Sequence, residues 1–121
     1  MVVGEAKTPI RPSVSWLDGA HEVHDIYENA VPQLFVPNIL SFATEGKELY
    51  YGAIRCPLEF WAPWRLENDE DAIAKRLGLG EVGKELSDLL NPARLLDIMR
   101  NFSLFSTDKK KRRIKIIPRF Q

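Results

Sequence analysis

The sequence predicts an α+β fold, in which a truncated sheet of three or so strands with one helix is followed by a short helical connector. Two strand-like segments, 38–44 and 48–55, flank a glycine-containing turn. The segment 19–29 carries apolar residues at helical spacing. Beyond residue 65 the strand patterns give way to short helix-like segments, so we expect a domain boundary near Arg65.

The elements of the first half follow from local signals. Residues 1–6 have a strand-like apolar pattern that no strand or turn precedes, and for this reason we expect the sheet to be truncated here. A proline-containing loop follows, and Asp18 is the expected N-cap of the helix. Glu45-Gly46-Lys47 is the expected hairpin turn.

The second half predicts helices and one further strand. We expect short helices over 71–77 and 81–90. A third helix is expected to begin at Asn91 and Pro92, which are typical of an N-cap and a first helical turn. The segment 113–120 alternates basic and apolar residues, as a strand does.

Charges cancel over the whole chain but are separated along it. Seventeen basic and 17 acidic residues leave no net charge that would favour nucleic acid or a membrane surface as a partner. The acidic cluster consists of Glu67, Asp69, Glu70 and Asp71, and the basic segment contains Lys109, Lys110, Lys111, Arg112, Arg113 and Lys115. The basic segment is either a solvated linker or a sequence-independent contact to DNA phosphates.

Cysteine content and hydropathy indicate a cytoplasmic protein with no membrane contact. The single cysteine, Cys56, cannot form an internal disulfide, which is usual in reducing compartments. Glu5 and Lys7 interrupt the first apolar residues too early for a secretory signal. No later apolar stretch approaches the length of a membrane span.

The motif Glu5-Ala6-Lys7 is the main candidate for chemistry. Residues two apart in a strand project from the same face, so both side chains can reach one site. A carboxylate can hold a divalent metal and a lysine can orient or activate the attacking water in phosphodiester hydrolysis. Since Glu45-Gly46-Lys47 repeats the spacing within an expected turn, the motif alone is a weak signal.

Two other motifs fail in their context. His21 and His24 are three residues apart, whereas the zinc-protease pattern HExxH needs them four apart. The segment 78–84 resembles a phosphate-binding loop, but a charged segment precedes it and Glu85 replaces the hydroxyl residue that would bind magnesium. We therefore interpret this segment as a turn between helices and predict that it does not bind ATP.

Several segments in succession carry a family resemblance. The segments are GEAKTPIRPSVSWLDGA, HDIYENAVPQLFVPN, FATEGKELYYGAIRCPLEFWAPW, LLNPARLLDIMRNF and KIIPRFQ. In order and spacing they resemble the R subunits (restriction/motor subunits) of type I restriction enzymes, over almost the entire chain. In that family a PD-(D/E)xK nuclease domain precedes a helicase-like motor that pumps DNA using ATP.

The resemblance implies three parts. Residues 1–65 would be the C-terminal part of the nuclease domain, with a truncated restriction-endonuclease-like sheet. Residues 66–108 would be the helical connector. Residues 109–121 would be a basic linker and the start of the motor domain.

Site residues carry over by position. Glu5 and Lys7 match the metal-binding carboxylate and the catalytic lysine of the family's ExK element. Tyr27 matches the tyrosine of the QxxxY helix that follows, whereas Val23 stands where many members have the glutamine. Gln121 resembles the glutamine that reads the adenine of ATP in such motors.

The resemblance also implies an activity and its partners. The parent subunit would cleave double-stranded DNA with Mg²⁺, coupled to ATP-driven translocation, in a complex with modification and specificity subunits. In this family the aspartate of the metal site lies on a strand before ExK, and the ATP-binding loop follows the glutamine. We therefore expect the metal site to be incomplete, ATP binding to belong to the parent only, and the 121 residues alone to be inactive.

Two alternatives remain open. The chain could be a noncatalytic module that binds DNA or docks to a protein, which predicts exposed aromatic side chains at Phe60, Trp61 and Trp64. It could also be a complete small nuclease that takes its missing carboxylate from a second copy. This second alternative requires Glu5 and Lys7 to lie close to a two-fold axis.

Overall fold

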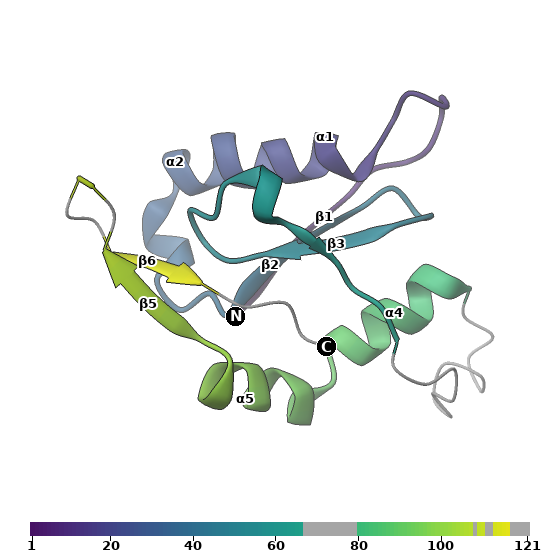
Figure 1. The fold of residues 1–121 in the computed structure, drawn as a ribbon. Helices are drawn as coiled ribbons and strands as arrows, with labels where there is room; N and C mark the ends of the chain where they lie inside the picture. Colours follow the sequence, from purple (N-terminus) through teal and green to yellow (C-terminus); the bar gives the residue numbers. More distant parts are fainter. Residues whose placement is uncertain (67–79, 108, 111–112, 117–121) are drawn as a thin grey trace.

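A four-stranded sheet organises the chain in the computed structural model, which describes residues 1–66, 80–107, 109–110 and 113–116 (Figure 1). The strands are β1 (Val2–Ala6), β2 (Leu40–Thr44), β3 (Leu49–Gly52) and β4 (Ala62–Pro63), in the spatial order β1-β2-β3-β4. β1 and β2 run parallel, and the other neighbours are antiparallel. The predicted α+β fold class is confirmed.

One continuous helical segment covers one face of the sheet and connects the parallel strands β1 and β2, as such a connection requires (Figure 1). It comprises α1 (Trp16–His21), a π-helical turn η1 (Glu22–Tyr27) and α2 (Glu28–Ala30), and a 3₁₀ helix, η2 (Pro32–Phe35), follows. We call this side of the sheet the α1 face.

The helix on the α1 face begins earlier than the sequence predicted. Ser15, not Asp18, is the N-cap, and its hydroxyl accepts a hydrogen bond from the Leu17 N–H at 3.2 Å. The Asp18 carboxylate returns the contact by accepting the Ser15 N–H at 2.8 Å. Asp18 therefore completes a capping box within the first turn, which explains why it resembled a cap.

Two further helices cover the opposite face of the sheet (Figure 1). They are α4 (Glu81–Leu89) and α5 (Pro92–Asn101). Asn91 caps α5 by accepting the Ala93 N–H at 2.9 Å, as predicted. The core of this α5 face consists of Leu40, Leu49, Tyr51, Ala62, Trp64, Leu89 and Ile98.

A polar set also ties the helices of the α5 face to the sheet. Trp64, which follows β4, donates its indole N–H to Asp88 at 2.9 Å. Arg94 of α5 pairs with the other Asp88 oxygen at 2.8 Å. Residues 80–101 and the sheet thus share one core, while the assignment of 1–65, 66–108 and 109–121 to parts of a larger subunit stays a prediction. The helix expected over 71–77 lies outside the described residues.

The predicted hairpin is confirmed, with a shorter second strand. Gly46 lies in the connection with φ 92°, a conformation that favours glycine. β3 ends at Gly52 rather than at Arg55, because the chain turns there and Arg55 itself takes φ 58°. The Arg55 N–H is satisfied by the Glu28 carboxylate at 2.9 Å, which joins this turn to α2.

A second, two-stranded sheet follows α5. It pairs β5 (Leu104–Thr107) with β6 (Arg113–Ile116), and the described part of the predicted strand 113–120 is β6. β5 was not predicted. Within the described residues, no helix has both the length and the apolar character needed to span a bilayer.

Candidate functional site

Four side chains form a closed ring where β1 meets the helix on the α1 face. Lys7 Nζ lies 3.2 Å from Glu5 Oε1 and 2.5 Å from Glu22 Oε1. The Tyr27 hydroxyl lies 3.2 Å from the remaining Glu5 oxygen and 3.1 Å from that of Glu22. One lysine and one tyrosine therefore each bridge the same two carboxylates. We call Glu5, Lys7, Glu22 and Tyr27 the carboxylate ring.

Local structure explains why these residues meet. Glu5 lies in β1, and the Lys7 N–H extends the pairing with β2 by bonding to the Thr44 carbonyl at 2.8 Å. The helix passes close above Glu5 at Gly19, where an added Cβ would lie 3.2 Å from Glu5 Cγ. A larger residue at this position would press on the Glu5 side chain.

The two predicted residues of the ExK motif do share a face, but that face is partly covered. The side chains of Glu5 and Lys7 are 22% and 24% exposed, because the helix lies over them. We expected Glu5 and Lys7 to lie together on an open, solvent-reaching face, and the helix covers more of that face than this expectation allowed. The site reaches solvent from its edge, and the helix supplies Glu22 and Tyr27 from above.

Electrostatics in the carboxylate ring keep the lysine charged. Its hydrogen bond to Glu22 raises the pKa of Lys7, partial burial opposes this rise, and Glu5 adds to it. The same contact with Lys7 holds the pKa of Glu22 below its usual range. The Glu22 carboxylate, followed by partial burial and Glu5, raises the pKa of Tyr27. At neutral pH the ring thus contains an ammonium, an ionised Glu22 and a neutral phenol that can donate one proton.

The ring fits part of a magnesium site. Carboxylate oxygens are the ligands that Mg²⁺ prefers, and Glu5 presents one at the solvent-reaching edge. Within the described residues, no group of three or more His, Cys, Asp and Glu side chains could hold a metal ion. The described part of the chain thus offers Glu5, with Glu22 beside it, and further ligands would come from water or from outside these residues.

Glu22 is the site residue that sequence reasoning missed. Its signal is present in the sequence, because Glu22 lies five residues before Tyr27. A search for partners of Tyr27 at α-helical spacing leads instead to Val23, which is fully buried in the core of the α1 face.

The other predicted site residues lie far along the chain from the ring. Lys109 and Lys110 are exposed between β5 and β6. Arg113 and Lys115 belong to strand β6. Lys111, Arg112 and Gln121 lie outside the described residues, so their roles stay predictions.

The two histidines that failed the zinc-protease pattern have a common partner. His21 Nδ1 lies 2.6 Å from one Asp25 oxygen and His24 Nδ1 lies 2.7 Å from the other. His21, followed by His24, lowers the pKa of Asp25. These contacts are on the outer surface of the helix, since the Asp25 side chain is 53% exposed.

The segment that resembled a phosphate loop begins a helix. Gly80 is the N-cap of α4, and Lys84 in the same helix lies 3.5 Å from Glu81. Gly78 and Leu79 lie outside the described residues.

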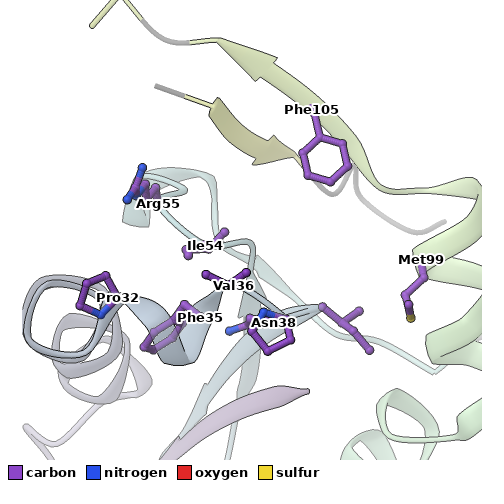
Figure 2. Close-up of a pocket in the computed structure, with 10 residues that line it drawn as sticks. Pro32, Phe35, Val36, Asn38, Ile54, Arg55, Met99 and Phe105 are labelled. Carbon is purple, nitrogen blue, oxygen red and sulfur yellow. The ribbon is translucent and has the colours of Figure 1, made fainter. Parts of the chain in front are cut away.

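An apolar cleft of about 480 Å³ lies away from the carboxylate ring (Figure 2). Figure 2 shows Phe35 and Val36 on one side, with Met99 of α5 and Phe105 of β5 facing them. Among the described residues that line it, Arg55 is the one charged residue. These described residues offer no nucleophile and no acid–base group, so the carboxylate ring is the better candidate for catalysis.

The aromatic surface expected for a docking module is largely absent from the described residues 60–64. Trp61 and Trp64 are each 3% exposed and belong to the two cores, and only Phe60 is open, at 66%. This burial counts against the noncatalytic alternative in the form that the sequence suggested.

Comparisons with known proteins agree with the resemblance. The chain is 28% identical over 117 residues, 97% of its length, to the endonuclease subunit of the type I restriction enzyme HindI of Haemophilus influenzae. It is 30% identical over 122 residues, 99% of its length, to a protein of Methanocaldococcus jannaschii with the name "Putative type I restriction enzyme MjaVIIIP endonuclease subunit".

Over its whole length the chain is thus similar to type I restriction endonuclease subunits. The resemblance predicted from the sequence is confirmed. The chain spans 11% of the length of each of these two relatives. No protein-family model and no solved structure matches the chain.

Proposed function

We propose that these residues form part of the nuclease of a type I restriction endonuclease subunit, which cleaves double-stranded DNA with Mg²⁺. The observation that supports this most is the pairing of Glu5 and Lys7 at the end of β1, in a chain that is similar to such subunits over its whole length. A carboxylate and an ammonium 3.2 Å apart are the groups that metal-dependent phosphodiester hydrolysis uses.

Each residue of the motif has a distinct role in the proposal. Glu5 binds Mg²⁺, which polarises the phosphate and activates water when bound. Lys7 orients the attacking water and stabilises the negative charge that develops on the phosphate oxygens. Tyr27 holds the Glu5 carboxylate through its hydroxyl. The water oxygen forms a bond to phosphorus and gives up one proton to solvent, a P–O bond of the backbone breaks, and the leaving oxygen gains a proton.

The parent protein adds functions that these residues do not carry alone. We propose that its motor uses ATP to translocate DNA, that Gln121 contacts the adenine, and that modification and specificity subunits are its partners. Restriction of foreign DNA by such a complex takes place in the cytoplasm.

A polypeptide limited to these 121 residues is proposed to be inactive. Four residues precede Glu5 in it, whereas the family's second metal-binding carboxylate comes from an earlier strand. A metal held by Glu5 and water lacks a fixed geometry, and losing a ligand of a preorganised site removes several kcal/mol of transition-state stabilisation, at about 1.4 kcal/mol per tenfold in rate.

The basic segment is proposed to contact the DNA backbone. Lys109 and Lys110 are exposed between β5 and β6, where lysine side chains can approach phosphates. Binding of duplex DNA to the chain should weaken steeply with salt, and changing Lys110, Lys111 and Arg112 to Ala should flatten that dependence. An unchanged salt dependence would identify the segment as a solvated linker.

Plasmid cleavage tests the proposal. The full-length subunit that carries this segment, assembled with its modification and specificity subunits, should cleave DNA with Mg²⁺ and ATP. Glu5→Ala and Lys7→Ala should each abolish cleavage. Lys47→Ala is the matched control, because Glu45-Gly46-Lys47 repeats the spacing of the motif in a turn where Lys47 is exposed. Cleavage that survives Lys7→Ala would overturn the proposal, and metal-dependent cleavage by the 121 residues that Lys7→Ala removes would favour the dimer alternative.

A further inference from the structure

A π-helical turn determines which residue of the helix reaches Lys7. In the segment Glu22–Tyr27 the Glu28 N–H bonds to the Val23 carbonyl, five residues back instead of four. This spacing places Glu22 and Tyr27, five residues apart, over the same point of the sheet. Turns of this kind lie frequently at functional sites.

Because of the same turn, the residue four positions before Tyr27 points into the core. Val23 is fully buried and packs with Ala20, Phe35, Ala43 and Trp61. Position 23 therefore cannot supply a polar group to the site. Glu22 takes this role in the helix.

Glu22 and Glu5 hold the lysine unequally. The Lys7 ammonium lies 2.5 Å from Glu22 and 3.2 Å from Glu5. The shorter contact makes Glu22 the principal partner of the ammonium, and Glu5 is its second partner.

We propose that Glu22, brought into place by the π-helical turn, is the positioning residue for Lys7. It acts through Lys7 rather than on the substrate: it fixes the ammonium beside Glu5 on a side chain that is otherwise flexible. The inference rests on the proposed nuclease function for its catalytic consequence, but the positioning itself is a property of the described structure.

The first experiment measures the order of Lys7 without any activity. NMR relaxation of the lysine ε-methylene groups in the 121-residue protein should show Lys7 restricted and Lys47, exposed in its turn, mobile. Glu22→Ala should make Lys7 as mobile as Lys47, and Glu22→Gln should retain part of the order. The control is Asp25→Asn, an exposed acid of the same helix whose partners are His21 and His24, which should leave Lys7 unchanged. Unchanged order of Lys7 in Glu22→Ala would overturn the inference.

The second experiment measures cleavage by the full-length subunit in its complex. Glu22→Ala should lower the rate at saturating Mg²⁺ about 10–100-fold, as is common when a supporting contact is lost, with Glu22→Gln between it and the unchanged protein. The Mg²⁺ concentration for half-maximal rate should hardly change, and a large rise in it would instead make Glu22 a metal ligand and overturn the positioning role. Wild-type activity in Glu22→Ala with none in Lys7→Ala would overturn this inference alone. Full activity in Lys7→Ala would remove the proposed function and the catalytic part of the inference together.

Discussion

The two faces of the sheet are covered by helices that meet it in different ways. On the α5 face, Leu89 and Ile98 are fully buried against the strands, and the polar contacts of Trp64, Asp88 and Arg94 close the edge of that core. On the α1 face, Val23 is buried in the same manner, but one turn of the helix contacts the sheet through the polar side chains of the carboxylate ring. Stability thus depends mostly on apolar contacts, and the groups able to do chemistry lie where polar contacts between helix and sheet replace apolar ones.

The largest effect is expected from a cavity on the α5 face. Ile98→Ala should lower the free energy of unfolding by about 2–5 kcal/mol, because the deleted atoms are fully buried against the sheet. Leu96→Ala, in the same helix but 64% exposed, is the matched control and should cost far less. Urea unfolding measures both variants. Equal, small losses would mean that α5 does not belong to the cooperative core.

A smaller loss is expected from the polar edge of the same face. Asp88→Ala removes the acceptor of the Trp64 indole and the partner of Arg94, which should cost about 1.5–3 kcal/mol of unfolding free energy. Asp97→Ala is the control, since Asp97 accepts a hydrogen bond from Asn101 of its own helix. Two urea curves with the same midpoint would show that apolar packing alone holds this face.

The α1 face contains a buried acid that should make stability depend on pH. Burial raises the pKa of Glu28 above its ordinary value of 4.5, and the hydrogen bond from the Arg55 N–H opposes the rise. The folded protein therefore binds this proton more tightly than the unfolded chain does. The stabilising contribution of Glu28 is complete below the unfolded pKa and is lost as the pH rises through the folded pKa.

Glu28→Gln tests this pH dependence. The variant stays neutral at every pH, so its stability relative to the unchanged protein should rise as the pH increases above the unfolded pKa of Glu28. The exposed Glu59→Gln should show no such gain. Urea unfolding at several pH values provides the measurement, and a constant difference between Glu28→Gln and the unchanged protein would contradict the assignment.

The smallest effect on stability is expected in the carboxylate ring itself. Tyr27→Phe removes the hydroxyl that lies between Glu5 and Glu22 but keeps the aromatic ring that packs on the core. Because the ring of charges is partly solvated, the urea midpoint should stay within experimental error. A loss as large as that of Asp88→Ala would show that both faces use polar contacts for stability.

Local signals predicted the elements that depend on one or two residues. Gly46 indicated the hairpin turn, and Asn91 with Pro92 indicated the start of α5. Asp18 indicated a helix start but not its position, because Ser15 and Asp18 share the capping box. β5 escaped prediction because its four residues are all exposed and have no apolar face.

The candidate site was predicted only as far as strand periodicity reaches. The spacing of Glu5 and Lys7 places both on one face in any strand, and the structure brings them together. Glu22 could not be found in this way, because its position depends on a π-helical turn. That turn forms where Val23 packs into the core while Tyr27 faces the sheet, and this is a property of the folded molecule.

The π-helical turn also changes how chains of this kind should be sought. One residue added to an α-helix rotates all that follows by about 100°, and a π-helical turn absorbs that rotation within a few residues. A search pattern that requires a glutamine four residues before the tyrosine misses this chain, because Val23 occupies that position. A pattern that also accepts a glutamate five residues before the tyrosine would retrieve it, together with any relatives that have the same spacing.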